Sequence, residues 1–333
     1  MENKKIRFGV VGTNFITDWV IAGGREDNRF ELTAVYSRTE ETAKQFAAKH
    51  QIPHTFTSLE VMASSPLIDA VYIASPNALH AGQSILCMQH GKHVLCEKAF
   101  ASNAAEVRQM IEIAKKYQVV LMEAMKSTLT PGFRTVIENL PKIGQIRNYF
   151  ACFCQYSSRY DKLKEGIILN AFNPEFSNGA IMDIGIYTLY PMVVLFGRPS
   201  KIQATGIKLF SGVDGQGSVN FNYESGLNAT ILYSKIADSK LPTEIQGEEG
   251  IITLDRINII SEATLTPRKG TSLNILPKPD HNEYYYEIAE FINLIESGQK
   301  ESMINSLENS LITIEIIDEI RRQLGVVFPA DKK

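Results

Sequence analysis

The sequence predicts an α/β protein. Its N-terminal domain is expected to be a Rossmann doubly wound parallel sheet, and its C-terminal domain an α+β fold on an open, mostly antiparallel sheet. Over the first 125 residues, short β-branched apolar runs alternate with helical patterns at a regular interval, as in βαβ units. From about residue 144, alternating strands separated by turn residues replace that pattern. We therefore expect domains at residues 1–125 and 126–333.

The N-terminal pattern predicts five strands joined by helices. Runs that are apolar on both faces, such as Phe8-Gly9-Val10-Val11, are typical of parallel strands covered by helices on either side. The strands are expected at residues 6–11, 32–36, 70–74, 93–96 and 119–122, and the helices near residues 15–22, 40–50, 78–90 and 104–117.

The C-terminal pattern predicts hairpins and two closing helices. Residues 218–223 and 227–233 flank the turn Glu224-Ser225-Gly226, and residues 243–246 and 251–254 flank a second turn that contains two glycines. The last helices are expected at residues 284–296 and 306–324, since apolar residues recur there at helical spacing.

Composition and charge favour small molecules as partners. A chain of 333 residues with 44% apolar and 21% charged residues is an ordinary globular protein. The net charge of -3, with charges scattered along the chain, provides no basic stripe for nucleic acid and no polybasic membrane anchor. No apolar run approaches the ~20 residues of a membrane span, and the start Met1-Glu2-Asn3-Lys4-Lys5 has no signal-peptide character. We expect a cytoplasmic protein.

The cysteines and histidines do not predict a metal site. Four cysteines form no C-x-x-C pair and lie in apolar context, which predicts reduced core thiols. The six histidines form no cluster with metal-ligand spacing. We therefore expect no bound metal.

The first chemical motif is the turn between the first expected strand and helix. Backbone N–H groups at such a helix start can bind a pyrophosphate. Against the pattern G-x-G-x-x-G, Asn14 and Thr17 stand where the second and third glycines would be, although asparagine tolerates a left-handed backbone. The alternative is a plain turn with Thr13 or Asn14 as N-cap. Its place after the first strand favours dinucleotide binding by Gly9, Gly12, Thr13, Asn14 and Phe15.

The second expected strand ends at Ser37-Arg38, where an NAD-binding fold usually has an acid for the ribose 2′-hydroxyl. A guanidinium binds phosphate oxygens in a fork and stacks on adenine. The pair therefore predicts NADP(H), with NAD(H) as the less favoured cofactor. The alternative is that Ser37 only caps the next helix and Arg38 is a solvated charge.

Two distant segments supply groups for hydride transfer at a carbinol carbon. Lys98 follows the apolar run 93–96, and Asp183 and Tyr187 lie four residues apart, on one face if they are helical. Pro191 can kink or restart that helix. Free tyrosine titrates near ~10, so a nearby ammonium is needed to favour phenolate at neutral pH. Lys98 and Tyr187 are therefore expected to act as one unit.

Taken together, these segments resemble the Gfo/Idh/MocA oxidoreductase family over essentially the whole chain. The version with Tyr187 is most similar to the branch that contains dimeric dihydrodiol dehydrogenase and glucose–fructose oxidoreductase. The segments that carry the resemblance are residues 9–14, Ser37-Arg38, residues 75–80, Cys96-Glu97-Lys98-Ala99, residues 179–187 and the closing stretch 305–325.

The resemblance implies a role for individual residues. Ser75, Asn77 and His80 match the family segment that faces the dinucleotide, although a surface imidazole is an alternative for His80. Glu97-Lys98 matches the E-K-P motif, with Ala99 in place of proline, and both residues are expected at the cofactor. In the family pattern the equivalent of Asp183 faces the substrate, and that of Tyr187 donates a proton to the carbonyl oxygen.

Other positions depart from the family pattern and bear on the substrate. Asn170 stands where an arginine is frequent, and Lys126 and Thr128 lie where related chains have an aromatic residue and an arginine. Lys126 and Asn170 are each either substrate contacts or plain surface. The expected substrate site therefore contains Lys98, Asn170, Asp183 and Tyr187.

The expected function is that of an NAD(P)-dependent dehydrogenase or reductase acting on a CH–OH or carbonyl carbon of a sugar, cyclic polyol or dihydrodiol. One rival is a dinucleotide-binding sensor or scaffold that has lost turnover, and a second is a NAD-using enzyme that retains its cofactor through the cycle. A large apolar sheet face would be costly in water, so we expect a homo-oligomer, dimer or tetramer, through the C-terminal sheet.

Overall fold

The computed structural model describes residues 5–332. The expected lack of a signal peptide was based on residues 1–5, and four of these lie outside the described residues. The chain forms two compact units. The first contains the residues up to Lys126 and Asp280–Ser310, and the second contains Ser127–Pro279 and the residues from Leu311 onward. Residues 280–310, which the sequence pattern placed in the C-terminal domain, thus pack in the first unit.

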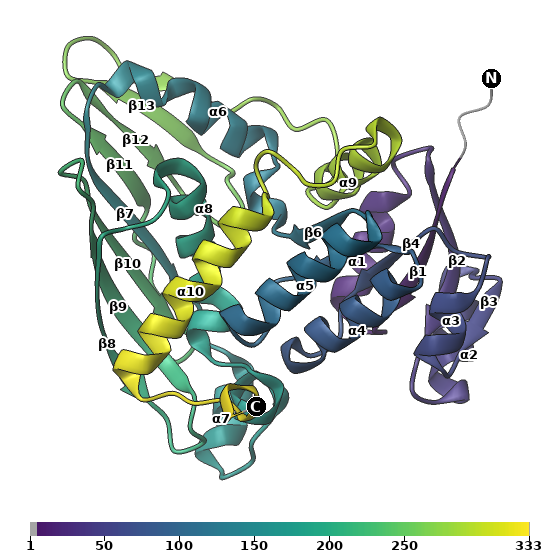
Figure 1. Ribbon diagram of the computed structural model, residues 1–333. Helices are drawn as coiled ribbons and strands as arrows, with labels where there is room; N and C mark the ends of the chain where they lie inside the picture. The colour runs from purple at the N-terminus through teal and green to yellow at the C-terminus, as the bar shows by residue number, and fades with distance from the viewer. Residues whose placement is uncertain (1–4, 333) are drawn as a thin grey trace. The chain divides into compact units, whose positions relative to one another are not determined.

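The first unit is built on a parallel sheet of six strands in the order β3-β2-β1-β4-β5-β6, which confirms the Rossmann fold (Figure 1). The strands are β1 (Ile6–Val11), β2 (Phe30–Tyr36), β3 (His54–Phe56), β4 (Ala70–Ile73), β5 (His93–Glu97) and β6 (Leu121–Ala124). The short edge strand β3 was not predicted because its residues are mostly exposed and form no apolar run.

Helices cover both faces of this sheet. Phe8 of β1 packs against Phe291 of α9 with ring centroids 5.9 Å apart, whereas a Cβ on the next residue, Gly9, would lie 3.3 Å from Met62 of α3. The two faces of β1 are therefore both buried, as its apolar run predicted. The helices of this unit are α1 (Phe15–Gly24), α2 (Glu40–His50), α3 (Leu59–Ser64), α4 (Asn77–Gln89), α5 (Ala104–Tyr117) and α9 (Tyr285–Ser297).

The second unit is built on a sheet of eight strands in the order β14-β13-β12-β11-β7-β10-β9-β8. The central pair β7 and β10 is parallel and the other neighbours are antiparallel, which confirms the mostly antiparallel sheet. The strands are β7 (Ile146–Cys154), β8 (Lys201–Lys208), β9 (Asp214–Asn222), β10 (Asn228–Ser234), β11 (Thr243–Gly247), β12 (Gly250–Leu254), β13 (Ala263–Pro267) and β14 (Leu273–Asn274).

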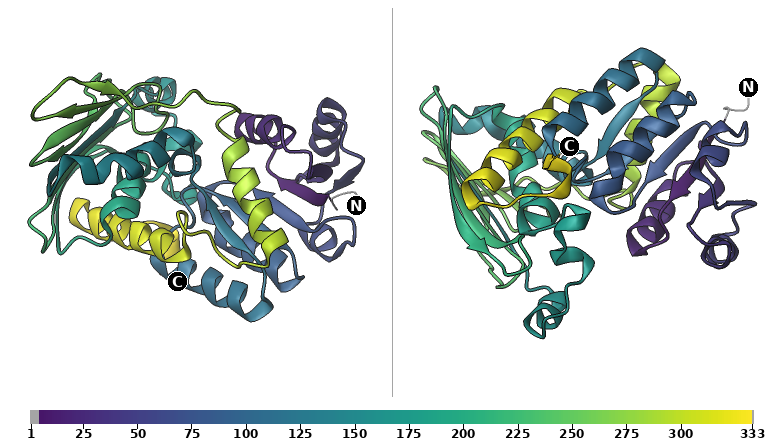
Figure 2. Two further views of the ribbon diagram at one scale, coloured as in Figure 1. Left: turned by 90° about the horizontal axis from the view of Figure 1, so that it is seen from above. Right: turned by 60° about the horizontal axis from the view of Figure 1, so that its bottom comes forward.

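One face of this sheet carries the helices (Figures 1 and 2). The Tyr149 hydroxyl of β7 donates to the Thr188 carbonyl of α8 at 2.9 Å, and Gln323 of α10 donates to the Ile202 carbonyl of β8 at 3.0 Å. The α-helices are α6 (Pro131–Asn139), α7 (Ser158–Lys164), α8 (Ile186–Phe196) and α10 (Leu307–Leu324), with a π-helical turn at Ile181–Gly185 and 3₁₀ turns at Lys126–Thr128, Leu140–Ile143, Asn170–Phe172, Pro174–Phe176 and Pro329–Lys332.

The other face of the sheet is lined largely by polar side chains that bond across strands. Thr230 donates to Asn220 at 2.8 Å, Asn222 donates to Asn228 at 2.6 Å, and Asn148 donates to Gln246 at 3.2 Å. The expectation of a large apolar face was therefore wrong. Alternating polar residues on an antiparallel sheet let this face meet water.

One helical stretch, Pro174–Phe196, is long and apolar enough to cross a membrane by length and composition, so the expectation that no such run exists was wrong. Because 72% of its apolar window is buried inside the protein, we interpret it as a core helix.

All four cysteines are free thiols. Within residues 5–332, no group of three or more His, Cys, Asp or Glu side chains is placed to hold a metal ion.

Candidate functional site

The loop after β1 is shaped by Gly12, which has a φ of +107°. A Cβ on Gly12 would lie 2.5 Å from the carbonyl oxygen of Ala74, at the end of the neighbouring strand β4. Only glycine lets the two strand ends approach this closely. The chain leaves β1 and β4 toward helices on opposite faces of the sheet, and such a switch point is where this fold binds a dinucleotide.

Asn14 fixes this loop with both ends of its amide. Its Oδ1 accepts from the Ile16 N–H at 2.9 Å, which caps α1, and its Nδ2 donates to the Ala74 carbonyl at 2.9 Å. Its φ of -92° is extended, so Asn14 does not use the left-handed backbone that asparagine tolerates. Thr17, at the third glycine position, is buried and donates to the Gly12 carbonyl at 3.0 Å. Polar side chains thus stabilise the turn where the pattern has glycines.

The remaining residues of this motif differ in exposure. Gly9 is buried within β1, while Phe15 at the start of α1 is half-exposed. The Phe15 ring meets the Trp19 ring edge-on at a centroid distance of 5.0 Å, and the centroid of the Trp19 ring lies 6.0 Å from that of Tyr284, the residue before α9. Trp19 is the only tryptophan of the chain, so it reports optically on this loop.

Ser37 and Arg38 follow β2 directly. The Ser37 N–H donates to the Phe56 carbonyl of β3 at 3.1 Å, and Arg38 is exposed. Thr39, not Ser37, is the N-cap of α2, where its side chain accepts from the Thr42 N–H. The alternative interpretation of Ser37 as a helix cap is therefore wrong.

His80 joins two loops at the carboxyl edge of the sheet. Its ring is fully buried, with Nε2 2.7 Å from the Ser75 carbonyl and Nδ1 2.9 Å from the Ala99 carbonyl. Burial lowers its pKa to about 4, so one nitrogen at a time donates at neutral pH. The alternative of a surface imidazole is wrong. The Ser75 hydroxyl donates to Gln83 at 2.7 Å, and Asn77 is buried at the start of α4.

Lys98 follows the last residue of β5 and is half-buried. The Lys98–Ala99 peptide bond is cis. The neighbouring Glu97 accepts from the Tyr72 hydroxyl at 2.5 Å, and removal of its carboxyl group from water raises its pKa. Glu97 therefore faces the interior of the unit beside Tyr72, while Lys98 begins the loop.

Two buried carboxyl groups in this unit were not predicted. Glu123 of β6 accepts from the Phe100 N–H at 3.1 Å, two residues after Lys98, and burial raises its pKa to about 8. Among residues 5–332, neither carboxyl oxygen of Glu287 in α9 has a hydrogen-bond partner, and burial, followed by the charge of Glu97, raises its pKa well above its usual range. The one feature of the sequence that could have revealed these two carboxyl groups is that each acid lies within an otherwise apolar run.

Lys126 is not a plain surface residue, which was one of the two alternatives considered for it from the sequence. Its side chain is buried, forms an ion pair with Glu283 and lies 4.3 Å from the centroid of the Tyr284 ring. All three residues belong to the first unit, so Lys126 ties β6 to the segment that begins α9.

In the second unit, Asp183 and Tyr187 lie at the start of one long helical segment. Asp183 is in the π-helical turn, Tyr187 is in the first turn of α8, and Pro191 lies inside α8. A π turn inserts an extra residue into a helix and is frequent at functional sites. The segment, for which a helix and a partial turn were both left open from the sequence, is thus a π turn followed by an α-helix. The Tyr187 ring packs edge-on against Phe153 of β7, with centroids 5.8 Å apart.

Asp214 anchors the beginning of that segment. Its Oδ2 accepts from the Ile181 N–H at 2.7 Å, and a carboxylate at a helix N-terminus also suits the helix dipole. Burial raises the pKa of Asp214 to about 6 although the backbone N–H bonds oppose this. Asp214 was not among the site residues predicted from the sequence.

Lys235, which follows β10, was also missed. Its ammonium forms an ion pair with the Asp183 carboxylate and lies 5.3 Å from the centroid of the Phe172 ring. A lysine two residues after the predicted strand 227–233 was the available signal. Asn170 is exposed in the 3₁₀ turn that contains Phe172, and its carbonyl accepts from Asn178 at 2.9 Å.

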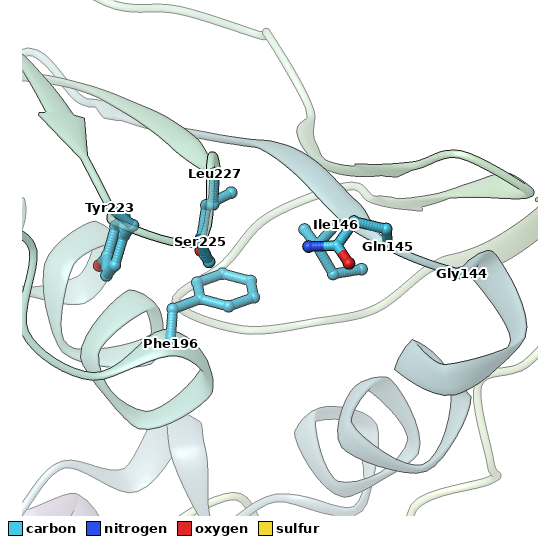
Figure 3. Close-up of a pocket in the computed structure, with 7 residues that line it drawn as sticks. All are labelled: Gly144, Gln145, Ile146, Phe196, Tyr223, Ser225 and Leu227. Atoms are coloured by element: carbon cyan, nitrogen blue, oxygen red, sulfur yellow. The ribbon is translucent and has the colours of Figure 1, made fainter.

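An open groove of about 320 Å³ lies elsewhere in the second unit (Figure 3). Its wall includes Phe196, at the far end of α8 from Tyr187, and no carboxylate or ammonium. Burial raises the pKa of the Tyr223 phenol in its lining, which makes that hydroxyl a poor group for proton transfer near neutral pH. Its lining residues are Gly144, Gln145, Ile146, Phe196, Tyr223, Ser225 and Leu227.

Comparison with known proteins agrees with this description. Residues 6–125 match the family model of the oxidoreductase family with NAD-binding Rossmann fold, and residues 140–253 match the Gfo/Idh/MocA C-terminal domain. The chain is 51% identical to scyllo-inositol 2-dehydrogenase (NADP(+)) of Bacillus subtilis, over 98% of this chain and 99% of the relative. It is 30% identical to trans-1,2-dihydrobenzene-1,2-diol dehydrogenase of Mus musculus, over 98% of this chain and 99% of that relative.

Among solved structures, a 3-ketoreductase from Actinomadura kijaniata in complex with NADP and TDP-benzene has the same fold. It is 22% identical, with a TM-score of 0.83 over 96% of this chain and 98% of that chain. The nucleotide-loop geometry, the matches to both family models and the full-length similarity lead to one conclusion. This chain belongs to the Gfo/Idh/MocA family of oxidoreductases.

Proposed function

We propose that the protein is an NADP(H)-dependent dehydrogenase or reductase that transfers a hydride to or from a CH–OH or carbonyl carbon of a cyclic polyol, with scyllo-inositol as the first candidate. The observation that carries the proposal is the presentation of Asp183 and Tyr187 on one anchored helix start, with Asp183 paired to Lys235. The full-length similarity to a scyllo-inositol dehydrogenase supports the substrate class.

The first unit would hold the cofactor. The close approach of the Gly12 backbone to the end of β4, and the N–H groups at the start of α1, fit a pyrophosphate at the edge between β1 and β4. Thr13, Asn14, Phe15, Ser75 and Asn77 belong to the same loops, and His80 acts through the carbonyls it bridges. When bound, NADP(H) supplies or accepts the hydride.

Ser37 and Arg38 support NADP(H) over NAD(H). Arg38 is exposed at the end of β2, and no acid stands there to bind a free ribose 2′-hydroxyl. An arginine fork binds a 2′-phosphate with two charge-assisted bonds. The relative with 51% identity carries NADP(+) in its name, which supports the same choice.

We assign the proton transfer to Tyr187. In oxidation its phenolate accepts the proton of the substrate hydroxyl, and in reduction its hydroxyl returns a proton to the carbonyl oxygen. We assign to the Lys98 ammonium the role that the family resemblance implies for it, which is to favour the phenolate by its charge. The Asp183 carboxylate accepts a hydrogen bond from a neighbouring hydroxyl and so orients the ring, while exposed Asn170 is assigned to the substrate side.

Trp19 fluorescence tests the cofactor assignment, and substrate turnover tests the reaction. Titration of the purified protein with NADPH and NADH should quench Trp19 at lower NADPH than NADH concentrations. The same sample, given NADP⁺ and scyllo-inositol or related polyols, should produce NADPH. Tight binding without turnover across sugars, polyols and dihydrodiols would support the sensor or scaffold alternative.

A Tyr187→Phe variant tests the chemical role of the phenol. It should bind NADPH as the unaltered protein does and lose kcat by roughly 100-fold or more, the usual contribution of general acid–base catalysis. An unchanged kcat would overturn the assignment.

We also propose a cytoplasmic homo-oligomer, dimer or tetramer, formed through the C-terminal sheet, as the family resemblance implies. The hydrogen-bonded polar side chains on the open face of that sheet would make such an interface polar. Sedimentation velocity of the unaltered protein and of a Thr230→Arg variant tests this. A monomer in both would contradict it.

A further inference from the structure

We infer that Lys235 is a positioning residue of the substrate site: it fixes the Asp183 carboxylate and balances its charge, so that the site selects uncharged hydroxylated rings over amines. The inference rests on the proposed function. It adds Lys235 to the substrate site and predicts that the site prefers uncharged substrates to cationic ones. All residues that carry it belong to the second unit.

The two members of the ion pair differ sharply in exposure. The Lys235 side chain is 4% exposed, whereas the Asp183 side chain is 34% exposed. The carboxylate therefore reaches solvent while the ammonium lies behind it. A buried ammonium without an anion is costly, so the position of Lys235 constrains where the Asp183 carboxylate can lie.

The backbone and ring contacts of Lys235 hold it in place. Its N–H donates to the Gly215 carbonyl at 2.9 Å, and its carbonyl accepts from the Ser157 N–H at 2.9 Å. The ammonium is 5.3 Å from the centroid of the Phe172 ring, within range of a cation–π interaction. These contacts anchor both the main chain and the charged end of the residue.

A second carboxyl group, that of Asp214, faces the same region from β9. It is fully buried, and its Oδ2 accepts from the Ile181 N–H, so it stabilises the start of the helical segment. The charge of Lys235 acts on Asp214 as well. Of these two acids, only Asp183 is exposed enough to meet a substrate.

The pair as a whole is neutral, and this decides which substrates it favours. A carboxylate held by one cation retains acceptor sites for a hydroxyl group. A cationic amine would gain less from a carboxylate whose charge is already balanced, and the Lys235 ammonium would repel it. Removing Lys235 should therefore weaken polyol binding and shift preference toward amines.

Binding measurements separate this inference from the chemistry. Calorimetric titration of the NADP⁺-loaded Tyr187→Phe variant with scyllo-inositol and with an amino-inositol gives affinities without turnover. In that background, Lys235→Met should raise the Kd for scyllo-inositol about tenfold or more and increase the ratio of amine to polyol affinity. Lys235→Arg should stay within about threefold, because it keeps the cation. Lys240→Met, which removes an exposed lysine nearby, should have no effect.

A double-variant cycle tests whether Lys235 acts through Asp183. In an Asp183→Asn background, Lys235→Met should change the Kd less than about twofold. A tenfold effect in both backgrounds, or unchanged polyol affinity in Lys235→Met, would overturn the inference. If Lys235→Met alone fails to fold, the Asp183→Asn/Lys235→Met pair removes both charges, and its affinity should equal that of Asp183→Asn. Failure of the proposed function shows instead as absent turnover in the unaltered enzyme.

Discussion

A Cβ on Gly179 would lie 2.2 Å from Oδ1 of Asp214, so the glycine leaves the space that this carboxylate occupies. From that position Asp214 accepts from the Ile181 N–H at 2.7 Å. The helical segment that starts there carries Asp183 and Tyr187. Gly179 and Asp214 together therefore fix the start of the helical segment that carries Asp183 and Tyr187, the proposed catalytic residues.

The Gly179→Ala variant should be strongly destabilised. The new methyl group meets a buried carboxylate, and the φ of +145° is unfavourable for alanine. The expected loss is about 2–4 kcal/mol of unfolding free energy, measured by urea denaturation, with lower kcat/KM in the folded fraction. Gly166→Ala is the matched control, because φ is also positive there but no atom lies within 4 Å of the new Cβ. Equal losses in the two variants would contradict this account.

Glu123 should make stability depend on pH. Burial raises its pKa from the ordinary 4.5 to about 8, so between these values the folded protein holds a proton that the unfolded chain has lost. The free energy of unfolding should therefore fall as the pH rises from about 5 to about 8, by a few kcal/mol. Glu123→Gln should make this slope shallower, leaving the part that the buried Glu97 and Glu287 contribute, and should be relatively more stable at pH 9. Denaturation at pH 5, 7 and 9 measures it, with exposed Glu112→Gln as control.

Arg38 should set cofactor preference. Arg38→Ala should raise the Kd for NADPH about tenfold and leave that for NADH within about threefold, because only NADPH has the 2′-phosphate. Trp19 fluorescence titration measures both constants. Lys44→Ala removes an exposed cation from the following helix and should change neither. Equal weakening of both cofactors would argue for a general electrostatic effect.

Asn14 should contribute more than a helix cap. Asn14→Ala loses the cap of α1 and the bond to the Ala74 carbonyl, so stability should fall by about 1 kcal/mol and NADPH affinity should fall as well. Thr39→Ala loses the comparable cap of α2 and should cost similar stability with little effect on NADPH. Thermal unfolding and fluorescence titration measure the two properties. Unchanged NADPH affinity in Asn14→Ala would show that the tie to β4 is unimportant for binding.

The elements of the first unit were largely predictable because they rest on local patterns. Residues 40–50 and 104–117 were placed at their observed bounds, since a polar N-cap precedes each and an apolar face repeats at helical spacing. The edge strand β3 was missed because three mostly exposed residues show no such pattern. The assignment of residues 280–310 depended on packing: Phe291 meets Phe8, a contact between residues far apart in the chain.

The sequence alone determined the fold class, the family and the candidates Lys98, Asp183 and Tyr187, because periodicity and motif spacing are written along the chain. Only the tertiary structure identified Asp214 and Lys235 as residues that position the site, and Glu123 as a residue that affects stability. Their ionisation and contacts depend on burial and on partners from other strands, such as the Asp183 carboxylate beside Lys235. Such partners meet only when the sheet forms, and the energy of a charge depends on the surroundings that folding creates.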